Sequence, residues 1–154
     1  MENSKSNFSF KKIKGRAIPF FLFPILITIL GKFLDLHKYV PITQNYETEI
    51  LKNFMKFLYF LGLGIFFFCN GFSDYISKKI FSKKSDYYEK IRGYYFYTLI
   101  MLSFINLISV SGFLGFLICG NFSWLATFSI INFLTLFSYF PSQKKFKHKF
   151  EKFQ

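Results

Sequence analysis

The sequence has no charged residue between Arg92 and Lys144, a run of 51 residues from Gly93 to Gln143. As a single helix, this run would extend about 75 Å, whereas the hydrocarbon core of a bilayer is about 30 Å thick. The run therefore predicts two membrane-spanning helices that are joined by a turn near Gly120. Lipid is the expected solvent for this part of the chain.

Acidic residues are also scarce, with 8 Asp and Glu against 20 Lys and Arg. In a soluble protein, the resulting net charge of +12 would indicate nucleic-acid binding. Here the basic residues form clusters beside apolar segments, which is typical of membrane orientation signals and of contact with anionic lipid headgroups. No basic stretch belongs to a nucleic-acid module. We therefore expect anionic lipid headgroups, and no nucleic acid, as partners.

Cysteine is nearly absent, and Cys69 and Cys119 belong to no CxxC or Cys/His cluster. This pattern argues against a redox or zinc site. His37 beside Asp35 could form half of a metal site, but no further histidine or cysteine lies nearby, so a solvated loop is the favoured interpretation. We expect neither a metal nor a cofactor.

Apolar residues are abundant, because 52% of the chain is hydrophobic and 26 residues are Phe. A soluble domain of this length buries only about two-thirds of its surface and could not hide so much aromatic area. The pattern predicts an all-α integral membrane bundle of four transmembrane helices in a single membrane domain, 1–154. The predicted spans are 17–36, 54–73, 94–119 and 122–140, with a basic lead at 1–16 and a basic amphipathic tail at 141–154.

Proline and glycine predict local features of the first two spans. Pro19 is expected in the first turn of its helix, where proline is tolerated, and Pro24 is expected to kink the helix or loosen its hydrogen bonding. A re-entrant first segment is the alternative to a full span. In the second span, Gly62, Gly64 and Gly71 are expected to let a neighbouring backbone approach.

Two basic segments have an amphipathic pattern. Between Asp74 and Arg92, apolar residues recur at spacings of three, four and seven, which predicts that part of this loop lies as a helix along the headgroups. In the tail, Phe146, Phe150 and Phe153 share one helical face among lysines. The tail is either a second surface-lying segment or a solvated end.

The distribution of Lys and Arg predicts the orientation. The lead has five, the loop between spans two and three has six and the tail has five, whereas the loop between spans one and two has four and the final turn has none. Cytoplasmic loops carry the excess of Lys and Arg. We therefore expect both termini in the cytoplasm, with the protein in the cell (plasma or inner) membrane.

No ionisable residue lies in the middle of any predicted span. Such residues are the usual sign of proton relays and substrate pathways. Their absence weighs against a proton-coupled pump and against the small four-helix multidrug transporters, which depend on a carboxylate in the first helix. Ser, His and Asp occur, but no spacing forms a nucleophilic set. A membrane enzyme, which would need Asp74, loop acids and a histidine at one surface, is therefore the least favoured class.

Small and polar residues do recur every three positions along the last two spans. The candidate polar seam consists of Ser103, Asn106, Ser109, Ser129, Asn132 and Thr135, with an asparagine near the middle of each helix. Three residues turn a helix by about 300°, so at most three or four members of a row can face one straight neighbour. The seam either packs the two helices together or lines a path for lipid or solute, or receives a partner protein.

A second candidate is the pair Asn70 and Asp74, four residues apart at one end of the second span. It could bind a cation at the cytoplasmic mouth, but capping or pairing with Lys78 or Lys79 is favoured. The leading functional hypothesis is a non-enzymatic membrane protein that acts through helix–helix contacts, as a homo-oligomer or an accessory subunit of a larger complex. The alternative is a carrier or channel for lipid or a small neutral solute, which predicts a polar cavity beside Asn106 and Asn132.

Overall fold

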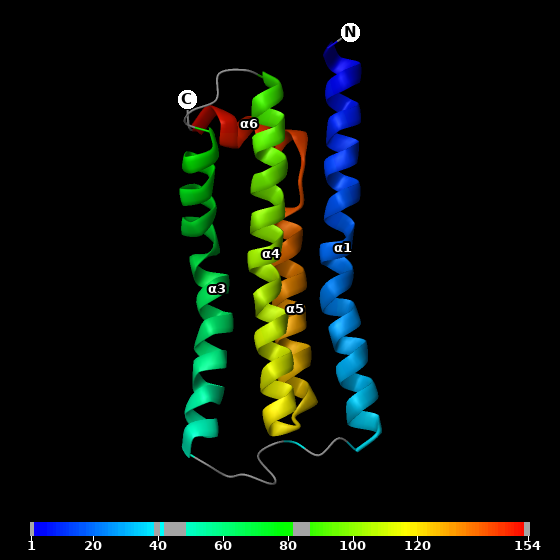
Figure 1. The fold of residues 1–154 in the computed structure, drawn as a ribbon, viewed down its shortest axis with the longest axis vertical. Coiled ribbons are helices and arrows are strands. Elements are labelled where there is room, and N and C mark those ends of the chain that lie inside the picture. Colours follow the sequence, from blue (N-terminus) through cyan, green and yellow to red (C-terminus); the bar gives the residue numbers. More distant parts are fainter. Residues whose placement is uncertain (1, 39–40, 42–48, 82–86, 153–154) are drawn as a thin grey trace.

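The computed structural model describes residues 2–38, 41, 49–81 and 87–152. All elements in these ranges are helices, and the predicted all-α class is confirmed. They are α1 (Glu2–Leu36), α3 (Glu49–Phe81), α4 (Tyr87–Cys119), α5 (Phe122–Tyr139) and α6 (Gln143–Lys152) (Figure 1). In the described part of the chain, α1, α3, α4 and α5 are long and apolar enough to cross a bilayer.

Helix α4 lies at the centre of the arrangement. It packs against α3, α5 and α1, whereas α1 packs against α4 and α5 and lies across the molecule from α3 (Figure 1). Most of the apolar stretch of α4 is buried, but most of that of α1 and α3 is exposed. The outward faces of these two flanking helices carry large apolar side chains, including Leu26, Ile29, Phe60 and Phe67. Such faces suit hydrocarbon rather than water.

The hairpin between α4 and α5 turns where the sequence predicts. Gly120 has a φ of 69°, in the left-handed region that glycine adopts without a steric penalty. Asn121 then caps α5, because its side-chain Oδ1 accepts a hydrogen bond of 3.0 Å from the backbone N–H of Ser123. This cap supplies a partner for a backbone donor that the first turn of a helix leaves unpaired.

Glycines admit aromatic rings at the helix contacts. The Phe128 side chain lies against both Gly62 and Gly112, and the indole of Trp124 lies against Gly115; a Cβ at any of these glycines would clash with that side chain. The prediction that a neighbouring backbone approaches Gly62, Gly64 and Gly71 is wrong for Gly62, and it stays a prediction for Gly64 and Gly71. Gly62 receives a side chain, and the other two meet no atom within 4 Å because they lie on the outer side of α3.

Helix α1 begins earlier than expected. It starts at Glu2, so Pro19 lies inside the helix and not in its first turn. The basic lead continues the helix because it contains no proline. Around Pro24 the helix has side-chain support, since Thr28 Oγ1 donates a hydrogen bond of 2.7 Å to the Pro24 carbonyl.

The basic segment after the second span forms no separate surface helix before Phe81. Instead, α3 continues without a break through Asp74 to Phe81, and α4 begins at Tyr87. The reason is local, because no glycine or proline interrupts residues 74–81, and Lys78 and Lys79 complement the helix dipole in the last turn. The rest of the predicted segment, 82–86, lies outside the described residues, as do most of residues 39–48.

The tail forms α6, which crosses the end of the bundle (Figure 1). Phe146 is buried there, with its ring centroid 5.4 Å from that of Phe10 and 5.3 Å from that of Tyr94. Contact between aromatic rings at such distances stabilises a packed cluster. The side chains of Phe150 and Phe153 lie outside the described residues.

Candidate functional site

Two asparagines form the centre of the buried polar cluster. Asn132 on α5 is fully buried, and its Nδ2 donates hydrogen bonds to Asn106 Oδ1 on α4 at 3.0 Å and to Ser109 Oγ at 2.6 Å. An amide in hydrocarbon seeks a partner because no water is available to it. The two amides therefore point at each other and join α4 to α5 at mid-height.

Asn106 also reaches the first helix. Its Nδ2 donates a hydrogen bond of 3.2 Å to the backbone carbonyl of Phe20 on α1. In an α-helix this carbonyl would accept from the N–H four residues later, but that residue is Pro24, which has no N–H. Asn106 thus supplies the donor that Pro24 lacks, and the cluster connects α1, α4 and α5.

The structure does not bring all six predicted residues together. Asn106, Ser109 and Asn132 meet, whereas Ser103 is exposed in a groove between α1 and α4 and Thr135 donates to the Ile131 carbonyl of its own helix at 2.7 Å. The drift of each row around its helix explains this division. Phe20 is the member that the sequence analysis missed, and the signal that could have found it is a proline four residues after a carbonyl inside a span.

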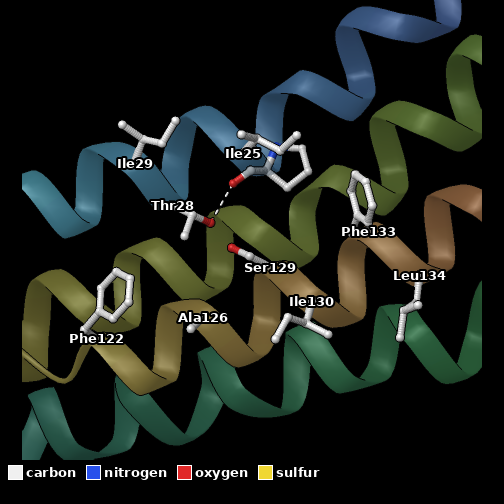
Figure 2. Close-up of a pocket in the computed structure, with 10 residues that line it drawn as sticks. Ile25, Thr28, Ile29, Phe122, Ala126, Ser129, Ile130, Phe133 and Leu134 are labelled. Carbon is white, nitrogen blue, oxygen red and sulfur yellow. Dashed lines mark hydrogen bonds between the residues drawn. The ribbon is translucent and has the colours of Figure 1, made fainter.

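Ser129 occupies a different position from the other candidates. It is 8% exposed, and its hydroxyl has no hydrogen-bond partner among the described residues. Figure 2 shows this hydroxyl directed toward α1, where it lines a groove of about 410 Å³ between α1 and α5. The other lining residues are almost all apolar; Thr28 adds the second hydroxyl and donates to Pro24. The groove is therefore a hydrophobic surface with one unsatisfied polar group.

Asn70, the first member of the candidate pair Asn70 and Asp74, bonds to another helix. Asn70 Oδ1 accepts a hydrogen bond of 2.6 Å from the Tyr139 hydroxyl, which joins α3 to α5. One turn further along α3, Ser73 Oγ and the Tyr97 hydroxyl lie 2.7 Å apart and join α3 to α4. Hydroxyl and amide groups at this end therefore connect helices, and Asn70 is engaged with another helix.

Lys145 on α6 caps the end of α5. Its Nζ donates to the backbone carbonyls of Ser138 at 2.7 Å and Phe140 at 3.1 Å, and lies 3.5 Å from that of Phe137. The last carbonyls of a helix have no partner within the helix and favour a cation. Burial lowers the pKa of the Lys145 ammonium below its ordinary value. This contact fixes α6 against the bundle.

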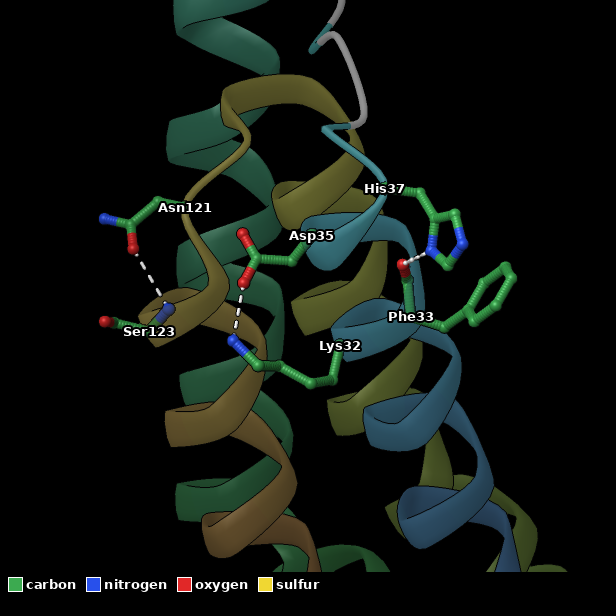
Figure 3. Close-up of polar contacts among 6 residues, drawn as sticks. All are labelled: Lys32, Phe33, Asp35, His37, Asn121 and Ser123. Carbon is green, nitrogen blue, oxygen red and sulfur yellow. Dashed lines mark hydrogen bonds and ion pairs between the residues drawn. The ribbon is translucent and has the colours of Figure 1, made fainter.

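The other end of α1 carries the residues considered for a metal site. Figure 3 shows His37 turned away from Asp35; a ring nitrogen of His37 lies 2.8 Å from the Phe33 carbonyl, while Asp35 pairs with Lys32 at 2.7 Å. In the described ranges, no group of three His, Cys, Asp or Glu side chains is arranged to hold a metal ion. Cys69 and Cys119 are both thiols.

In comparisons with known proteins, no family model, no curated protein and no solved structure matches the chain.

Proposed function

We propose that the protein is a non-enzymatic integral membrane protein that acts through helix–helix contacts, as a homo-oligomer or as an accessory subunit of a larger complex. The observation that carries this proposal is the use of the intramembrane amides. Asn132 donates to Asn106, and Asn106 donates to the Phe20 carbonyl, which makes both amides structural connections between helices.

The outer face of α3 is the proposed contact surface. Phe60, Gly64, Phe67, Gly71 and Tyr75 recur there at spacings of four, three, four and four, and therefore share one helical face. The aromatic members are 62% to 71% exposed, and both glycines meet open space. Small residues let two helices approach closely in lipid, and neighbouring rings add contact area. A second copy of α3 fits this surface by the same residues.

Orientation in the cell membrane is part of the proposal. The starts of α1 and α4, the end of α3 and the whole of α6 lie at one end of the molecule (Figure 1). Three basic segments are thus grouped at one end, and an excess of Lys and Arg marks the cytoplasmic side. Both termini would then be cytoplasmic, beside anionic headgroups.

Self-association in lipid tests the proposal. Gly64→Leu combined with Gly71→Leu should lower dimer formation about tenfold or more, measured by energy transfer between labelled copies in vesicles, because the added side chains separate the backbones. Gly15→Leu is the matched control, since Gly15 also meets no atom within 4 Å but lies on α1. A wild-type protein that remains monomeric in lipid and purifies from mild detergent without partners would contradict the proposal.

A carrier or channel for lipid or a small neutral solute is the second candidate. It is supported by a groove of about 320 Å³ between α1 and α4 that Ser103 and Asn106 line together with apolar residues. The hydrogen bond between the two amides weighs against a carrier or channel, because it engages Asn106 with Asn132 and not with the groove. Lipid scrambling or solute release from proteoliposomes, compared between the wild type and Ser103→Trp, tests this function.

A further inference from the structure

Three basic side chains line one pocket between α1 and α4. Lys12 and Arg16 come from α1, Arg92 comes from α4, and Tyr88 and Tyr95 complete the polar lining of a cavity of about 270 Å³. Among the described residues that line it, none carries a carboxylate; Glu89 lies on the same helix but outside this lining. The pocket is therefore a site of concentrated positive charge.

The arginines in this pocket are held by aromatic neighbours. The Arg16 guanidinium donates a hydrogen bond of 2.5 Å to the Tyr95 hydroxyl and lies 5.2 Å from the centroid of that ring. The Arg92 guanidinium lies 6.0 Å from the Phe96 ring centroid. A guanidinium has five N–H donors in a fixed plane, so contact with a ring orients it and leaves donors for a phosphate.

A separate apolar groove lies between the same two helices, further along each helix. It has a volume of about 320 Å³, and Pro19, Phe20 and Phe23 form its α1 wall. On α1, the lining residues of the pocket and of the groove share one face, because they recur at helical spacings of three or four: Lys12, Arg16, Pro19 and Phe20, and Phe23. On α4, Arg92, Tyr95, Ser103 and Asn106 likewise share one face. Charge at one end and hydrocarbon surface below it match the two parts of a phospholipid.

We propose that this α1–α4 face binds one anionic phospholipid, with its phosphate between Arg16 and Arg92 and an acyl chain in the groove below. The headgroup contact selects for negative charge, because basic pockets between transmembrane helices attract anionic headgroups and tyrosine suits the membrane interface. The groove explains why the ligand is a lipid, since a soluble phosphate would use the pocket alone. The proposal depends on membrane insertion, but not on self-association.

Binding of a defined lipid to the full chain in detergent tests this inference. Phosphatidylglycerol should bind to the wild type as one molecule, with at least about tenfold preference over phosphatidylcholine of the same chains, as counted by native mass spectrometry. Arg16→Gln combined with Arg92→Gln should remove that preference. Lys11→Gln combined with Lys14→Gln is the matched control, because both lysines are exposed on α1 outside the pocket, and it should change the affinity less than about twofold.

Further arms separate the possible ligands. Inorganic phosphate at millimolar concentration should not displace phosphatidylglycerol. Ser103→Trp, which fills the groove from an exposed position, should weaken the binding of long-chain phosphatidylglycerol but not that of dihexanoyl phosphatidylglycerol.

If Arg16→Gln/Arg92→Gln does not fold, Arg16→Lys/Arg92→Lys retains the charge and should still weaken binding severalfold through loss of the planar fork. Equal loss in the Lys11/Lys14 control, displacement by phosphate, or equal affinity for phosphatidylcholine would each overturn the inference. Energy transfer between copies measures self-association separately.

Discussion

Phe20 contributes to the buried cluster through its backbone carbonyl, because Pro24 four residues later has no N–H to donate. A proline inside a span normally leaves a carbonyl that neighbouring helices, hydroxyls or water must satisfy. Here a side-chain amide from α4 does so, and the same amide accepts from Asn132 on α5. One residue thereby converts a defect in α1 into a connection among three helices.

Asn106→Leu should lower the free energy of unfolding by about 1 to 2 kcal/mol, because it removes two interhelical hydrogen bonds and leaves the Phe20 carbonyl without its donor. Asn132→Leu should cost less, since it also removes an Oδ1 that has no partner among the described residues. Ser103→Ala, which changes an exposed hydroxyl of α4, is the control. Unfolding in mixed micelles measures all three, and equal effects for Asn106 and Ser103 would refute the role assigned to the cluster.

At the scale of the element, the hairpin of α4 and α5 is held by rings that fit against glycines. Phe128 lies between Gly62 on α3 and Gly112 on α4, so one side chain of α5 contacts both neighbours. Trp124 and Phe128 stack, with centroids 5.5 Å apart and ring planes at 16°. The close approach of α5 to α4 depends on the missing Cβ atoms. Glycines in these spans therefore have different roles according to the face that they occupy.

Gly112→Leu should destabilise the fold by about 1 to 3 kcal/mol or prevent folding, because the new side chain competes with Phe128 for the same space. Gly64→Leu should leave the free energy of unfolding unchanged or slightly higher, since a Cβ there meets no neighbour. Thermal unfolding in detergent distinguishes the two variants. Comparable destabilisation by both would show that the outer face of α3 is packed within the monomer.

At the scale of the whole molecule, α4 is enclosed by α1, α3 and α5, while α1 and α3 present their outer faces to the surroundings. The end that carries α6 gathers the basic lead, the pocket around Arg16 and the cap formed by Lys145. The opposite end carries Lys32 and Asp35 as an ion pair. This difference between the two ends supports the proposed orientation, in which the end that carries α6 is cytoplasmic.

Labelling of single cysteines in a Cys69→Ser/Cys119→Ser background tests the proposed orientation of the two ends. Lys38→Cys should react with a membrane-impermeant maleimide in intact cells, whereas Lys11→Cys and Lys147→Cys should react only after permeabilisation, because Lys and Arg are concentrated on the cytoplasmic side. All three lysines are exposed. Reaction of Lys11→Cys or Lys147→Cys in intact cells would contradict the proposed topology.

The sequence by itself determined the number of long apolar helices and the turn of the hairpin. These features depend on local properties: the absence of charge from 93–143, a glycine for the positive φ at position 120, and an asparagine to cap α5. The sequence also identified Asn106 and Asn132 as candidate intramembrane polar residues, because each lies near the middle of a predicted span. The helix boundaries predicted from the sequence were less accurate, since basic residues do not end a helix.

Only the tertiary structure decided which polar groups meet. Each residue turns a helix by about 100°, so the rotation of α4 against α5 separates a buried Ser109 from an exposed Ser103, although both belong to one row. Contacts between distant segments, such as Arg16 with Tyr95 and Asn106 with the carbonyl of Phe20, have no local sequence pattern. They arise because α1 packs against the hairpin, and that packing creates both the buried cluster and the basic pocket.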